Sequence, residues 1–139
     1  MATLATNEAT ISLTLGGYSF KAEEITELLG LKPTAIMNGN TRPGDERPAT
    51  SSWEYSTEKV SDDDLDIFSM TNEFIKSLEP VKENLLTAIE NYNLVPKIVV
   101  RMSIPMDKDI PFPELGFGSR TIKFLASIGA FIEIETEKH

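Results

Sequence analysis

The chain has 139 residues, with 22 acidic and 13 basic side chains and a formal net charge of −9. A chain of this length, 40% apolar and without repeats, is typical of one globular domain with a sizeable core. Its charge repels nucleic acids and anionic membranes, and the absence of cysteine excludes disulfides and thiolate chemistry. Residues 1–8 contain no basic region and no apolar run of signal-peptide length, and no later apolar stretch approaches the roughly 20 residues that span a membrane. We therefore expect a soluble, cytoplasmic protein.

The first predicted element is a strand over residues 9–15, where apolar side chains alternate with serine and threonine. Alternation with a period of two places the apolar set on one face of a sheet. We expect the glycine pair at 16–17 to turn the chain into a short amphipathic helix over residues 23–29. Gly30 should end this helix, because glycine adopts the left-handed backbone conformation without steric cost.

The next region is the least regular part of the chain. Residues 35–37 are predicted to form a short edge strand, and the glycines and prolines that follow up to residue 52 indicate a loop. Trp53 and Tyr55 alternate with polar residues, which favours a second strand with both aromatic rings toward the core.

A long helical region is predicted after this strand. Ser61 followed three residues later by Asp64 is a capping-box pattern, so we expect the helix to begin there. Its apolar stripe is interrupted at Pro80 and then resumes. Because proline is accommodated in the first turn of a helix but not in its interior, we predict two helices that meet near Glu79.

The last third of the chain is predicted to contain a strand, a loop and a helix followed by a strand. Residues 97–104 alternate between two faces and should form a central strand. A proline-rich loop follows, and we expect its three large apolar side chains to fold over the core rather than remain in water. They are Phe112, Leu115 and Phe117. A helix ended by Gly129 then leads into the final strand.

These elements predict a two-layer α+β fold, with a mainly antiparallel sheet of about four or five strands and helices packed on one face. Strands that are apolar on one face favour antiparallel pairing, although helical crossovers allow some parallel pairing. We expect residues 1–8 to be an extended or disordered N-terminus, residues 9–136 to form the single domain, and residues 137–139 to be a C-terminal tail.

Several segments together carry a family resemblance. They are the Ile-Ser-Leu strand, residues 23–34 (Glu-Glu-Ile-Thr-Glu-Leu-Leu-Gly-Leu-Lys-Pro-Thr), a loop rich in glycine and arginine, residues 53–56 (Trp-Glu-Tyr-Ser) and residues 125–130 (Leu-Ala-Ser-Ile-Gly-Ala). Over about residues 9–136 the chain resembles the bacterial family called domain of unknown function 4279. The resemblance implies a small stand-alone bacterial protein. Its signature positions are structural, so it transfers no catalytic or binding residue.

Few residues could support catalysis. The sole histidine is His139, and a mobile terminus would not hold a base within reach of a serine. Glu133 and Glu135 should share one face of the last strand, where carboxylates could act as acid and base, but such a face is usually solvated. A loop carries hard oxygen ligands without calcium-site spacing, namely Asp107, Asp109 and Glu114. We therefore predict no catalytic residue, no metal site and no cofactor.

The most distinctive polar cluster is the loop between the second and third strands. Arg42 and Arg47 lie there with Asn38 and Asn40, and Trp53 follows. Arginine forks bind carboxylate or phosphate groups bidentately, so these five residues are candidates for a small-anion site. The alternatives are that the arginines pair with nearby carboxylates and that the tryptophan belongs to the core.

Three functions follow from these observations. The first is a non-catalytic protein-interaction module for a basic protein, such as an immunity-like inhibitor whose carboxylates complement a basic toxin. The second is a binding protein for a small anionic ligand at the Arg42 and Arg47 loop. The third is a carboxylate- or metal-dependent hydrolase. We expect neither nucleic acid nor membrane as a partner, and an exposed edge strand allows a homodimer.

Overall fold

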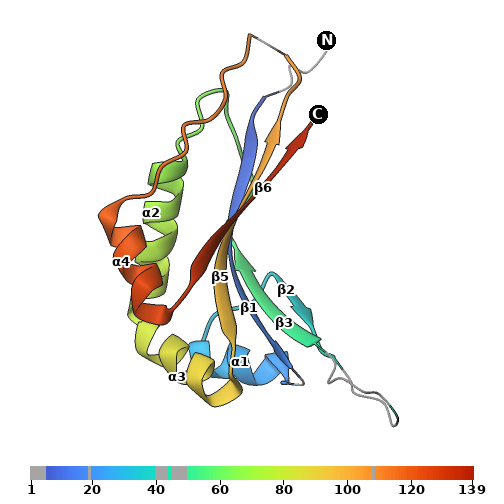
Figure 1. Cartoon of the computed structure of the whole chain (residues 1–139), viewed down its shortest axis with the longest axis vertical. Helices are drawn as coiled ribbons and strands as arrows, with labels where there is room; N and C mark the ends of the chain where they lie inside the picture. Colours follow the sequence, from blue (N-terminus) through green and yellow to red (C-terminus); the bar gives the residue numbers. More distant parts are fainter. Residues whose placement is uncertain (1–5, 19, 40–43, 45–49, 108) are drawn as a thin grey trace.

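The computed structural model describes residues 6–18, 20–39, 44, 50–107 and 109–139. It contains one twisted sheet with the helices packed on a single face, and no described helix covers the other face (Figure 1). The strands are β1 (Glu8–Tyr18), β2 (Ala35–Met37), β3 (Thr50–Ser56), β4 (Val60–Ser61), β5 (Val95–Ile104) and β6 (Phe131–Lys138). The helices are α1 (Ala22–Leu29), α2 (Ile67–Leu78), α3 (Lys82–Tyr92) and α4 (Ser119–Ile128), with a 3₁₀ turn η1 (Glu79–Val81) between α2 and α3.

The strand order is β2-β3-β1-β5-β6, with β4 pairing with β1 beyond the end of β3. All pairs are antiparallel except β5 and β6, which run parallel and are joined through α4. The predicted α+β class and the single helical layer are confirmed. Among the described residues the sheet has six strands rather than four or five, because the short β4 adds to β1.

Alternating residues of the two central strands build the core. Ile11 and Leu13 of β1 and Ile98 and Val100 of β5 are fully or almost fully buried and lie on the face that the helices cover. Apolar stripes of the helices pack against them, including Ile25, Phe74, Ile75, Leu78, Leu85, Phe124 and Leu125. The sheet is therefore apolar on one face and leaves its other face free for polar side chains.

Two local predictions are wrong, one near the start of the chain and one at the start of α2. The glycine pair at 16–17 does not turn the chain, because both residues pair with β3 and the strand continues to Tyr18. Ser61 is not a helix cap, since it pairs with Glu8 in β4. Asp66 is the N-cap of α2 instead, and its carboxylate accepts hydrogen bonds from the Ser69 backbone N–H at 3.2 Å and the Ser69 hydroxyl at 2.7 Å. The predicted break near residue 79 is confirmed.

The loop after β5 and the end of the chain also differ from expectation. Phe112 and Leu115 are 61% and 42% exposed, so only Phe117 packs against the core as predicted. The loop is attached through its backbone, because the buried Asn7 donates its side-chain amide to the Pro111 carbonyl at 2.9 Å. Residues 137 and 138, expected in a tail, belong to β6. None of the helices in the described ranges is long and apolar enough to cross a membrane.

The C-terminal glycine of α4 allows a test of backbone conformation alone. Gly129 has φ 69°, and a Cβ atom added there would meet no atom within 4 Å. We expect Gly129→Ala to lower the free energy of unfolding by about 1 kcal/mol, because a side chain disfavours the left-handed region. Gly116 is equally unobstructed and has no positive φ. Gly116→Ala should not destabilise the fold in urea titrations. Equal losses of unfolding free energy in the two variants would contradict the view that the cost at Gly129 comes from its left-handed backbone conformation.

The cap of α2 predicts a dependence on pH. Hydrogen bonds from Ser69 hold the pKa of the Asp66 carboxyl below its usual value. A lowered pKa contributes stability above the unfolded-state pKa, and this stability is lost as the pH falls through the folded-state pKa. Asp66→Ala should therefore lower Tm at neutral pH, and its difference from wild type should vanish in acid. Asp64→Ala is the control, and circular dichroism melts measure Tm for both variants. Equal losses of Tm in Asp64→Ala and Asp66→Ala at neutral pH would refute the role of Asp66 as the cap.

Candidate functional site

The candidate site is the uncovered face of the sheet, which we call the open face. The period of two along each strand brings polar residues from four strands onto it. Its residues are Glu8, Thr10, Ser12 and Thr14 of β1, Glu54 and Ser56 of β3, Lys97, Val99, Arg101 and Ser103 of β5, and Glu133, Glu135 and Glu137 of β6, with Lys59 between β3 and β4.

Arg101 joins all four strands of the open face. Its Nη1 donates to the Glu54 carboxylate at 2.7 Å and to the Ser12 hydroxyl at 3.2 Å, and its Nε donates to Glu135 at 3.0 Å. The Ser12 hydroxyl also shares a 2.7 Å hydrogen bond with that of Ser56. The bond to Glu54 is the main cause that raises the pKa of Arg101 above its usual value, and partial burial opposes it. The guanidinium is therefore a fixed positive centre between two carboxylates.

Two further ion pairs flank this centre. Lys97 lies 3.0 Å from Glu133, and Lys59 lies 3.5 Å from Glu8. Exposed pairs of this kind contribute about 0 to 1 kcal/mol each to stability, so they orient side chains more than they hold the fold together. Val99 lies between Lys97 and Arg101 on the same strand face and is fully buried. The aliphatic stems of long cationic side chains can cover such a residue while their charges stay in water.

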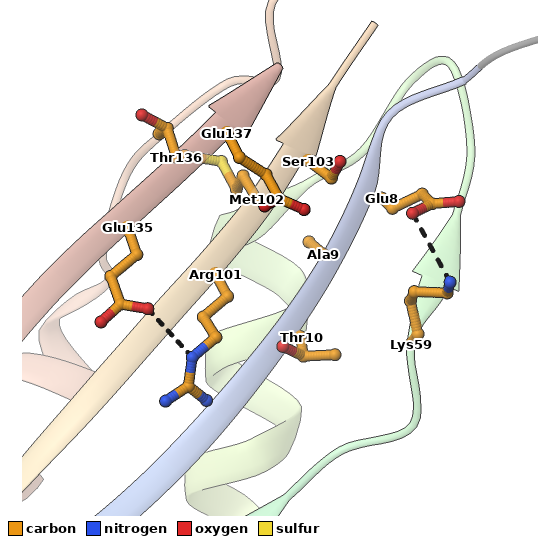
Figure 2. A pocket seen from close by; sticks show the side chains of 10 residues that line it. All are labelled: Glu8, Ala9, Thr10, Lys59, Arg101, Met102, Ser103, Glu135, Thr136 and Glu137. Atoms are coloured by element: carbon orange, nitrogen blue, oxygen red, sulfur yellow. Dashed lines mark hydrogen bonds and ion pairs between the residues drawn. The ribbon is translucent and has the colours of Figure 1, made fainter. Parts of the chain in front are cut away.

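A shallow groove of about 420 Å³ crosses the open face (Figure 2). Figure 2 shows Glu8 and Lys59 on one side and Arg101 with Glu135 on the other. Glu137 also lines the groove, and its carboxylate has no ion-pair partner among the described residues. Carboxylates therefore border the groove on both sides.

More carboxylates lie where the groove reaches the end of the sheet. Backbone hydrogen bonds connect this end to two acidic loops, from Asp62 to Asn7 and from Met106 to His139. The acidic residues of these loops are Asp62, Asp63, Asp64, Asp66, Asp107, Asp109 and Glu114. Within the described ranges, no group of three or more histidine, aspartate or glutamate side chains could hold a metal ion. The acidic side chains of both loops are exposed.

His139 is ordered by contacts that the sequence did not predict. Its backbone bonds to Ile104 and Met106 at 2.9 and 2.8 Å, and its Nδ1 lies 2.6 Å from the Ser103 hydroxyl. The expectation that this histidine could not reach a serine is therefore wrong. A nucleophile and base also need a third group that orients the base and donors for an oxyanion. In the described structure no side-chain or backbone group of the protein is hydrogen-bonded to the other ring nitrogen of His139.

The site predicted from sequence lies elsewhere and is only partly described. Arg42, Arg47 and Asn40 fall outside the described residues, so anion binding by this loop stays a prediction. The Asn38 side chain accepts the Ala22 backbone N–H at 2.8 Å and therefore caps the start of α1.

Trp53, the fifth predicted residue, is fully buried. Its Nε1 donates to the Thr26 hydroxyl at 3.0 Å, and its ring stacks on Tyr55 at 6.3 Å. With no exposed face, it fits the core alternative rather than stacking on a ligand. Asn38 and Trp53 thus both contact α1.

Sequence reasoning missed Arg101 and its partners. The alternation over residues 97–104 did place Arg101 on the polar face of a strand. Its contact with Glu54 depends on β1 lying between β3 and β5, and this strand order has no local signal. Glu135 was identified as a strand-face carboxylate, but its cation was not.

The Arg101 centre predicts a salt-dependent contribution to stability. Arg101→Gln should lower the free energy of unfolding by about 1 kcal/mol at low salt, because Glu54 and Glu135 lose their shared cation. The loss should shrink at high salt, where screening weakens exposed charges. Lys97→Gln removes one pair and should cost less. Urea titrations at two salt concentrations test this, and a salt-independent loss would assign the effect to packing instead.

Comparison with protein-family models agrees with the resemblance seen in the sequence. Residues 7–139 match the family described as domain of unknown function (DUF4279). The match begins at Asn7, which anchors the loop after β5, and covers all the described strands and helices. No curated protein and no solved structure matches the chain. Since the family match covers nearly its whole length, the chain belongs to the DUF4279 family.

Proposed function

We propose that this protein is a non-catalytic interaction module that binds a basic protein through the open face of its sheet. The observation that carries the proposal is a sheet face that no described helix covers (Figure 1). On this face the described glutamates outnumber the lysine and arginine residues. Two acidic loops join the same end of the sheet through backbone hydrogen bonds from Asp62 to Asn7 and from Met106 to His139. A field of one sign speeds the encounter with an oppositely charged partner and disfavours acidic ones.

The ion pairs of the open face support this role because they hold its carboxylates in place. Glu54, Glu133 and Glu135 each use one oxygen in a bond to a cation. A carboxylate accepts several hydrogen bonds, so each of the three can still accept one from a partner's lysine or arginine. Side chains that are already oriented lose less entropy on binding. The open face is thus organised to receive cations before a partner arrives.

An immunity-like inhibitor of a basic toxin is one specific form of such a module. The inhibitor would cover a positively charged site on the toxin with the open face. The support for this form is the acidic, single-domain architecture and the uncovered sheet, and the remaining step is analogy with other small acidic inhibitors.

The proposal predicts that binding depends on where the charges lie. The variant Glu133→Gln, Glu135→Gln, Glu137→Gln neutralises the edge of the open face. The matched control Glu27→Gln, Glu83→Gln, Glu90→Gln changes the net charge equally on exposed helical positions. We expect wild type and control to capture the same basic protein from native lysate at low salt. The open-face variant should bind it about tenfold more weakly in calorimetric titrations.

Salt provides the second measurement. Affinity for the captured protein should fall steeply between low and moderate salt, because the attracting charges are exposed. Equal weakening by the two triple variants, or an affinity that salt does not change, would overturn the proposal.

A further inference from the structure

Strand β6 forms one edge of the sheet and is paired on one side only. The His139 N–H donates to the Ile104 carbonyl, and the His139 carbonyl accepts the Met106 N–H. In a parallel ladder every second residue makes both bonds to the same neighbour, so Glu133, Glu135 and Glu137 bond toward β5. The intervening residues of β6 therefore direct their N–H and C=O groups outward. They are Ile132, Ile134, Thr136 and Lys138.

No other described segment covers this outer side. Apart from β5, no strand is hydrogen-bonded to β6, and in the described ranges no loop backbone bonds to Ile132, Ile134 or Thr136. Ile134 is 43% exposed on the helix-covered side of the strand. An unpaired strand edge of this kind is a template for a further strand.

The side chains of β6 define what such a strand would contain. The three glutamates lie on the open face, and the isoleucines lie on the other. The inner neighbour β5 already provides cations at alternate positions next to these glutamates, since Lys97 pairs with Glu133 and Arg101 pairs with Glu135. A strand on the outer side would meet the same row of carboxylates, and alternating lysine or arginine residues would complement it.

A second copy of this chain does not fit the outer edge. Residues that lie opposite each other in antiparallel strands project from the same face of the sheet. Two copies of β6 would therefore bring the glutamates of both strands onto one face, next to each other. Like charges in such positions are destabilising, so the homodimer allowed by the sequence is disfavoured at this edge.

We propose that β6 is the docking edge for an extended segment of a basic partner. The segment adds to the sheet as a further strand, with lysine or arginine at alternate positions facing Glu133, Glu135 and Glu137. Backbone hydrogen bonds to β6 provide binding that does not depend on sequence, and the alternating charges provide selectivity. This inference rests on the proposed function and adds the mode of binding and the chemistry of the bound segment.

Two synthetic peptides test the inference. One alternates lysine and valine over about nine residues, enough to span β6. The other has the same sequence with a methyl group on every backbone nitrogen, so it keeps its charge but has no backbone N–H to donate in a ladder along β6. Fluorescence anisotropy at low salt should show about tenfold tighter binding of the unmethylated peptide. The amides of Ile132, Ile134 and Thr136 should also become protected from hydrogen exchange.

A variant tests the same edge from the side of the protein. Ile134→Pro removes an N–H that points outward and is not used within the sheet, and proline is tolerated on edge strands. It should bind the unmethylated peptide about as weakly as wild type binds the methylated one. Ile134→Val keeps the N–H and should bind like wild type. Circular dichroism verifies that both variants fold, and the peptide comparison in wild type needs neither variant.

The outcomes separate this inference from the proposed function. If both peptides bind wild type equally and salt weakens both, basic chains bind the open face without strand addition, and only the inference is overturned. If neither peptide binds, the inference also fails. The glutamine variants with the captured protein then decide the proposed function independently.

Discussion

The apolar face shared by β1 and β5 is the constraint on which the rest of the structure depends. These central strands pair along most of their length and direct Ile11, Leu13, Ile98 and Val100 toward the helices. Burying a side chain of this kind contributes roughly 1.5 to 3 kcal/mol, far more than an exposed ion pair. Because successive residues of a strand point to opposite faces, the same burial forces the intervening polar residues onto the open face. The core thus determines where the charges lie.

The open face has a different chemical character from the core. Its interactions are ion pairs and hydroxyl contacts centred on Arg101, and they are exposed enough for salt to weaken them. They contribute little to folding and instead keep carboxylates oriented at the surface. A basic partner would meet a surface already arranged for cations, with the unpaired side of β6 next to it. Charge on the face and hydrogen-bonding groups along the edge act on the same partner in the proposed function.

The parts of the fold that could be predicted are those that local chemistry determines. Gly30 and Gly129 end helices in the left-handed conformation, with φ 67° and 69°, as their positions in the sequence indicated. The start of α2 was misplaced because Ser61 pairs in β4 and Asp66 is the cap, so tertiary pairing overrode a plausible local pattern. The Arg101 centre could not be predicted, since its partners come from strands β1, β3 and β6, which only the order of strands in the folded sheet brings close to Arg101.

The parallel pairing of β5 with β6 also has a consequence for states in which the sheet is incomplete. Strand β5 precedes α4 and β6 in the chain, so in any state in which β6 has not yet paired the sheet ends at β5. An unfinished sheet edge rich in isoleucine and valine is prone to associate with other nascent chains. Lys97 and Arg101 lie on that temporary edge, and charged residues there discourage such association. Lys97 and Arg101, which pair with Glu133 and Glu135 of β6 in the folded protein, would protect the edge of β5 in any state that lacks β6.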